Sequence, residues 1–77
     1  MYVEEEMYNE NIASMIKIQQ LELFKKQRGC NISEVGRLFK KYGVLEYIED
    51  AYEFLHIQGA NATYEDISAY IAQKEAL

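Results

Sequence analysis

The residues of this chain with the clearest chemical potential are its single cysteine and its single histidine, Cys30 and His56. A thiolate nucleophile needs an adjacent base or an electropositive pocket, and basic residues precede Cys30. Both residues lie near ends of predicted helices, which could meet in space. No third group that would orient the pair, and no oxyanion-stabilising element, can be named. We therefore interpret Cys30 as a half-buried turn residue and His56 as a helix-end residue, and we predict that the chain is not an enzyme.

The carboxylates do not indicate a metal or acid-base site. Glu4 to Glu6 form an acidic run near the N-terminus, and Glu49, Asp50 and Glu53 fall on the outer face of a predicted helix, where carboxylates usually face water. One histidine and one cysteine do not make a set of zinc ligands, and no glycine-rich phosphate loop is present. We predict no metal, no cofactor and no catalytic residue.

Length and composition indicate one small folded domain spanning residues 1–77. The apolar fraction is 49%, and the 13 acidic residues outnumber the 8 basic ones to give a net charge of -5. That balance disfavours nonspecific attraction to nucleic acid or to anionic membranes. No apolar run approaches the roughly 20 residues of a membrane span, the N-terminus is acidic where a secretory signal is basic, and a lone cysteine fits a reducing compartment. We expect a cytoplasmic protein that does not associate with membranes.

The spacing of apolar residues predicts an all-α, compact four-helix domain with helices at about 10–28, 32–42, 44–57 and 64–75. Short turns at Gly29, Gly43 and Gly59 separate them, and cations precede the first two of these glycines, which is typical of helix C-termini. Residues 1–9 lack a convincing period, so they are expected either to fray or to lead into the first helix. Residues 60–62 are expected to be briefly extended.

Two partial capping boxes set the predicted starts of the second and fourth helices. Asn31 is followed three residues later by Glu34, and Thr63 is followed three residues later by Asp66. In such a box the first side chain accepts a bond from a free backbone N–H, and the second reaches back. The predicted buried positions of these two helices are Ile32, Val35, Leu38, Phe39 and Tyr42, and Tyr64, Ile67, Tyr70 and Ile71.

The stretch from Val44 to Leu55 is the predicted centre of the fold. At about 100° per residue, one arc of this helix collects a set of apolar residues, and the acidic residues lie opposite. This core arc consists of Val44, Leu45, Ile48, Ala51, Tyr52 and Leu55. Tyr47 and Phe54, seven residues apart, form a separate aromatic shoulder beside it.

The first helix carries apolar residues on two sides, which one neighbour cannot cover. Ile12, Ile16 and Leu23 form one stripe, whereas Ile18, Leu21 and Phe24 lie toward the other side. A helix that is apolar nearly all round is central to a bundle or shared with another chain. We predict a partner interface that includes Ile18, Leu21, Tyr47 and Phe54. For Phe54, burial inside the same subunit is an equal alternative.

A nucleic-acid-binding regulator is the alternative function. The region Lys25–Lys41 holds six of the eight basic side chains and a single acid, and its short glycine turn is similar to that of a helix-turn-helix unit. The helix that would enter a DNA groove carries Glu46, Glu49, Asp50 and Glu53, however, and these would oppose phosphate. We therefore favour a protein partner over nucleic acid.

The segment from Asn31 onward resembles a small bacterial family of helical proteins of unassigned activity. The resemblance rests on Leu38 and Phe39, Tyr42 and Gly43, Tyr47 and Ile48, Tyr52 and Glu53, Leu55 and His56, Gly59, Asp66 and Ile67, and Tyr70 and Ile71. Members of this family resemble components of two-gene modules whose neighbour looks like a toxin related to ADP-ribosyltransferases. The resemblance implies an antitoxin-like or regulatory partner of a neighbouring gene product. Self-association as a homodimer is the other form that a non-catalytic interaction module would take.

Overall fold

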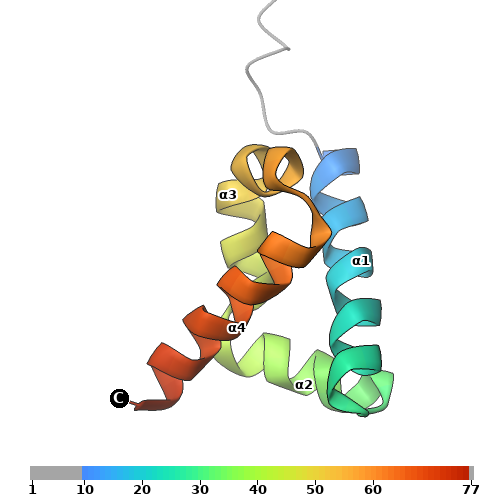
Figure 1. Cartoon of the computed structure of the whole chain (residues 1–77), viewed down its shortest axis with the longest axis vertical. Coiled ribbons are helices and arrows are strands. Elements are labelled where there is room, and N and C mark those ends of the chain that lie inside the picture. Colours follow the sequence, from blue (N-terminus) through green and yellow to red (C-terminus); the bar gives the residue numbers. More distant parts are fainter. Residues whose placement is uncertain (1–9, 77) are drawn as a thin grey trace, which may run out of the picture.

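The computed structural model describes residues 10–76, which form four α-helices (Figure 1). They are α1 (Glu10–Arg28), α2 (Ile32–Tyr42), α3 (Val44–Gln58) and α4 (Ala60–Ala76), and the described residues contain no strand. The prediction of an all-α, four-helix domain is confirmed. The expectation that residues 1–9 fray or lead into the first helix lies outside the described residues.

The helices α1 and α3 are the two central elements of the bundle. In Figure 1, α1 descends on one side, α2 crosses below, α3 returns upward and α4 descends again. Both α1 and α3 pack against each of the other three helices. Because its neighbours approach α1 from different directions, residues of both predicted apolar sides, such as Ile16 and Phe24, are buried.

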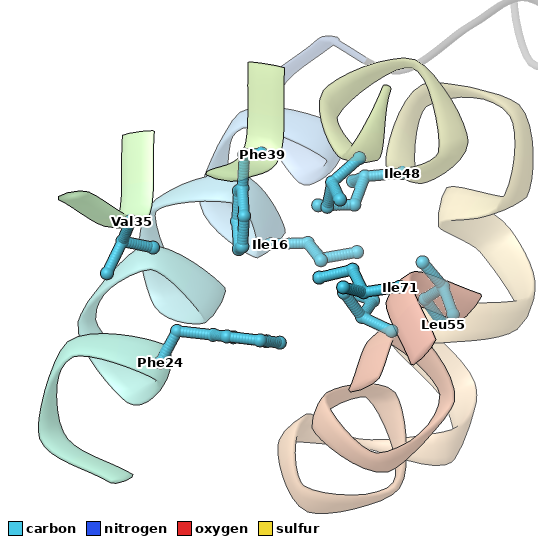
Figure 2. Packing of buried hydrophobic residues seen from close by; sticks show 9 residues of the cluster. Ile16, Phe24, Val35, Phe39, Ile48, Leu55 and Ile71 are labelled. Atoms are coloured by element: carbon cyan, nitrogen blue, oxygen red, sulfur yellow. The ribbon is translucent and has the colours of Figure 1, made fainter. Parts of the chain in front are cut away.

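The core is one apolar cluster to which all four helices contribute (Figure 2). Phe24 of α1 is fully buried, and its ring meets that of Phe39 edge-on, with centroids 5.1 Å apart, and that of Tyr64 at 4.6 Å. Such aromatic pairs stabilise a core beyond their buried area. The predicted arc of α3 is confirmed, since Val44, Ile48 and Leu55 are buried and Leu45, Ala51 and Tyr52 pack partly buried against them.

Local signals at the start and end of α2 account for its bounds. The Asn31 Oδ1 accepts a hydrogen bond from the Glu34 N–H at 2.9 Å, and the Asn31 N–H donates to the Glu34 Oε1 at 2.9 Å, so the predicted capping box is present. Gly43 ends α2 in the left-handed conformation, with φ of 68°, and α3 begins at the next residue. A side chain at Gly43 would strain this turn.

The predicted start of the fourth helix is wrong by several residues. Helix α4 begins at Ala60, so residues 60–62 are helical and Thr63 is not a cap. Thr63 is buried, and its Oγ1 donates to the Leu55 carbonyl at 3.2 Å. The carboxylate of Asp66 accepts from the Gln58 Nε2 at 2.8 Å. Gly59, with φ of 93° and ψ of 172°, reverses the chain in one residue and lets α4 start at once.

Two further positions differ from the expected burial pattern. Ile32, predicted on the buried face of the second helix, is the first residue of α2 and is 46% exposed. Gln20 of α1 is fully buried although it is polar. Its Nε2 donates to the Ala60 carbonyl at 3.1 Å, which attaches the start of α4 to α1, while its Oε1 lacks a partner within the described structure.

Candidate protein-interaction surface

Four of the large exposed apolar side chains form two adjacent pairs on helix surfaces. Met15 and Ile18 on α1 are 49% and 62% exposed, and Phe54 and Ile57 on α3 are 62% and 83% exposed. We call these the α1 pair and the α3 pair. Residues three apart on a helix are surface neighbours. A scattered exposed apolar residue needs no explanation, but each of these pairs makes a local apolar patch.

The α1 pair lies outside because of the direction in which α1 faces the core. Ala13, Ile16, Gln20 and Phe24 define the buried side of α1. Ile18 lies roughly 160° around the helix from Gln20, so it points away from the other helices. Leu21 of the predicted interface set, by contrast, is partly buried and packs against the core.

The predicted aromatic shoulder divides into one internal and one external residue. Tyr47 is partly buried, packs against the core and stacks on Tyr70 of α4, whereas Phe54 remains mostly in water. Burial raises the pKa of the Tyr47 phenol above its usual value, and nearby Asp66 and Tyr70 raise it further. Of the four predicted interface residues, Ile18 and Phe54 are therefore the two available to a partner without rearrangement.

A pocket of about 550 Å³ lies between the C-terminal half of α1 and the first turn of α4. It is lined by Gln19, Glu22, Leu23, Lys25, Lys26, Cys30, Ala60 and Asn61. The α1 pair lies one helical turn before two of these lining residues, because Met15 precedes Gln19 by four residues and Ile18 precedes Glu22 by four, a spacing that places each couple on the same side of the helix.

The family model for DUF3791, a protein of unknown function, matches residues 11–74, which include parts of all four helices. The chain belongs to the DUF3791 family. No curated protein and no solved structure matches it significantly. Membership of a family without assigned activity is thus confirmed, whereas pairing of this DUF3791 chain with a toxin stays a prediction.

The DUF3791 structure does not bring the candidate nucleophile and base together. Cys30 follows the end of α1, where its thiol lies 3.7 Å from the Arg28 carbonyl, and His56 is an exposed residue in the last turn of α3. Figure 1 shows these two helix ends at opposite ends of the molecule. Within the described part of the chain, no three His, Cys, Asp or Glu residues gather in a way that could hold a metal ion.

Five of the eight basic residues of the DUF3791 chain lie at two helix ends, the C-termini of α1 and of α2. Lys25, Lys26 and Arg28 occupy the last turn of α1, and Lys40 and Lys41 the last turn of α2. Cations at these positions are favourable to the helix dipoles.

None of the helices in residues 10–76 is sufficiently long and apolar to span a bilayer.

Sequence reasoning identified half of each apolar pair and missed the other half. It selected Ile18 and Phe54 but not Met15 or Ile57. Met15 lies three residues before Ile18 and Ile57 lies three residues after Phe54, so the helical spacing could have found both. The pocket carried no signal in the sequence, because it depends on how closely the start of α4 approaches α1.

Proposed function

We propose that this DUF3791 protein is a non-catalytic protein-interaction module. The observation that supports the proposal is the exposure of the α1 pair and the α3 pair after all four helices have packed. Buried apolar surface contributes roughly 25 cal/mol per Å², so covering these side chains would stabilise a complex. A domain of this size, without disulfides, obtains only about 3–5 kcal/mol from its own core and would gain from such a partner.

The partner is either a second copy of the chain or a cognate protein. The family resemblance supports a specific version of the second case, in which the chain is an antitoxin-like or regulatory partner of a neighbouring gene product. Co-expression with that gene tests this version. Rescue of growth inhibited by the neighbouring product would support it, and unchanged inhibition despite soluble expression of both proteins would refute it.

The nucleic-acid alternative has less support. The basic residues at the ends of α1 and α2 are exposed, but so are Glu46, Glu49, Asp50 and Glu53 on α3, the helix that would have to enter a groove. Carboxylates facing phosphates oppose binding. Absence of binding to random duplex DNA at low salt would remove this alternative.

The interaction proposal is tested with two patch variants and a control of equal charge. Met15→Glu with Ile18→Glu alters the α1 pair, and Phe54→Glu with Ile57→Glu alters the α3 pair. Ser33→Glu with Gln73→Glu introduces the same two charges at exposed positions of α2 and α4, away from both pairs. Circular dichroism first establishes that all three variants are folded.

Light scattering over a range of concentrations and affinity capture from the native cell then measure the interaction. We expect a dimer, or one protein captured in a fixed ratio, which is retained by the control of equal charge and lost in at least one patch variant. A monomer at all concentrations that captures no protein in a fixed ratio would refute the proposal. Retention of the complex in both patch variants would show that these side chains are not the interface.

A further inference from the structure

We infer that the pocket between α1 and α4 docks an acidic segment of the partner protein, with an apolar side chain of that segment seated against Leu23 and Ala60. The inference rests on the proposed function and specifies the chemistry of the partner. In this complex the pocket contacts the partner in addition to the apolar pairs, and the basic residues at the end of α1 attract its carboxylates.

The pocket has the size and lining of a binding site. Its volume of about 550 Å³ lies within the range of sites that bind small molecules or peptide side chains. Leu23, Cys30 and Ala60 contribute apolar surface, and the methylene stems of Lys25 and Lys26 add to it. An apolar side chain of a partner would be desolvated there.

The charge around the pocket favours a carboxylate. Lys25 and Lys26 are exposed, and neither forms an ion pair with any residue in the described range 10–76. Glu22 is the one acidic residue of the lining. The first turn of α4, which contributes Ala60, contains no acidic residue to offset the positive end of its helix dipole. A carboxylate entering beside the two lysines would be attracted by both.

The charge of the whole chain directs an acidic segment to this location. Six of the eight basic residues lie between Lys25 and Lys41, while the chain as a whole has a net charge of -5. An acidic segment is therefore attracted to basic sites such as the last turn of α1, which carries Lys25, Lys26 and Arg28, and this attraction increases both association rate and specificity.

The α1 pair gives the docked segment a continuation beyond the pocket. Met15 and Ile18 lie one helical turn before the lining residues Gln19 and Glu22. A partner helix with an apolar stripe and flanking carboxylates could therefore lie along α1 in the manner of a helix-in-groove complex. A nucleic acid fits less well, because phosphates gain nothing from the apolar floor formed by Leu23 and Ala60.

Carbodiimide cross-linking of the purified complex tests the inference directly, because this reagent joins a lysine amine to a carboxylate without a spacer. We expect cross-linked peptides, identified by mass spectrometry, that join Lys25 or Lys26 to Asp or Glu in a partner stretch that also contains apolar residues. Binding of the partner should also slow the reaction of Cys30, the single thiol of the chain, with a thiol reagent, since Cys30 lines the same pocket.

Three double variants give the cross-links a quantitative control. Lys25→Glu with Lys26→Glu should weaken partner binding by about tenfold or more, with a larger effect at low salt. Lys40→Glu with Lys41→Glu makes the same charge change on α2, outside the pocket, and should weaken binding by less than about threefold. Lys25→Arg with Lys26→Arg should retain binding but lose the cross-links, because a guanidinium group does not couple.

The possible results separate this inference from the proposed function. A captured partner that binds the Lys25→Glu, Lys26→Glu variant as tightly as the wild type would overturn the pocket assignment and leave the interaction module intact. Failure to capture any partner would overturn both. Cross-links from Lys25 or Lys26 to the acidic run Glu4 to Glu6 of this chain, or duplex DNA binding lost in the glutamate variant, would show that the pocket serves a different occupant.

Discussion

The rings of Tyr47 and Tyr70 stack with their centroids 4.8 Å apart and their planes 20° from parallel, and this pair joins α3 to α4. The Nζ of Lys74 lies 5.3 Å from the centroid of the Tyr70 ring. The stack lies close to the α2–α3 turn, since a Cβ built at Gly43 would be 3.9 Å from the Tyr70 hydroxyl. One aromatic residue of the predicted shoulder therefore stabilises the monomer, which leaves Phe54 as the exposed one.

The stack should contribute measurably to the stability of the monomer. We expect Tyr47→Leu and Tyr70→Leu each to lower the free energy of unfolding by about 1–2 kcal/mol, because each loses an aromatic pair while it keeps most of the apolar burial. The double variant should lose less than the sum, with a coupling of about 0.5–1.5 kcal/mol. Urea denaturation of the four proteins measures this cycle, and strictly additive losses would show that the rings do not interact.

The raised pKa of Tyr47 predicts a stability loss at alkaline pH. Because the folded pKa lies above the ordinary value of 10.0, the folded chain retains the phenolic proton longer than the unfolded chain does. The resulting stabilisation is complete below the unfolded pKa and disappears as the pH rises through the folded pKa. Between about pH 8 and pH 11 the wild type should therefore lose more stability than Tyr47→Phe does. Equal losses in both proteins would contradict the prediction.

The buried amide of Gln20 is predicted to be replaceable by an apolar side chain. Gln20→Met removes the bond from Nε2 to the Ala60 carbonyl, but it also removes the buried Oε1 that lacks a partner. An unsatisfied buried acceptor costs about as much as one hydrogen bond contributes, so stability should be unchanged or rise by up to about 1 kcal/mol. Gln20→Ala, which leaves a cavity, should cost about 2 kcal/mol. Thermal and urea unfolding distinguish the two variants. If Gln20→Met is as damaging as Gln20→Ala, the bond to Ala60 is the dominant contribution.

Gly36 and Gly43 should respond in opposite ways to the same substitution. Gly36 lies within α2, and a Cβ there would meet nothing within 4 Å. Gly36→Ala should therefore stabilise the protein by about 0.5–1 kcal/mol through helix propensity. Gly43 has φ of 68°, so Gly43→Ala should cost about 1–2 kcal/mol. Unfolding midpoints in urea provide the comparison, and a destabilising Gly36→Ala would indicate that this position has a contact outside the described chain.

The helix bounds were predictable wherever a local signal fixed them. Helices α1 and α2 begin and end where the sequence indicated, because Gly29, Gly43 and the Asn31–Glu34 box act through the backbone of their own neighbourhood. The start of α4 was missed because Thr63 and Asp66 have the residue types of a capping box but use their side chains to bind α3. Residue type alone does not distinguish a local cap from a tertiary hydrogen bond.

Periodicity predicted which residues share a face of a helix, but not which faces a neighbouring helix covers. The spacing showed that Ile18 and Leu21 lie away from the Ile12 stripe, but not that Leu21 packs against the core while Ile18 stays exposed. Tyr47 and Phe54 differ for the same reason, because α4 supplies a ring to stack on Tyr47. Gln20 gave no sign of burial, since its position opposite the Ala60 carbonyl depends on the packing of α4.

Among residues 10–76 the buried polar side chains are Gln20 and Thr63, and no charged group is buried. The ion pair between Lys17 and Glu49 joins α1 to α3 at the surface, where dissolved ions screen it. Concentrated salt should consequently leave the helical bundle intact while it detaches an electrostatically held acidic peptide. Gentle elution from immobilised chain with a salt gradient, without denaturant, therefore becomes a practical route to the partner.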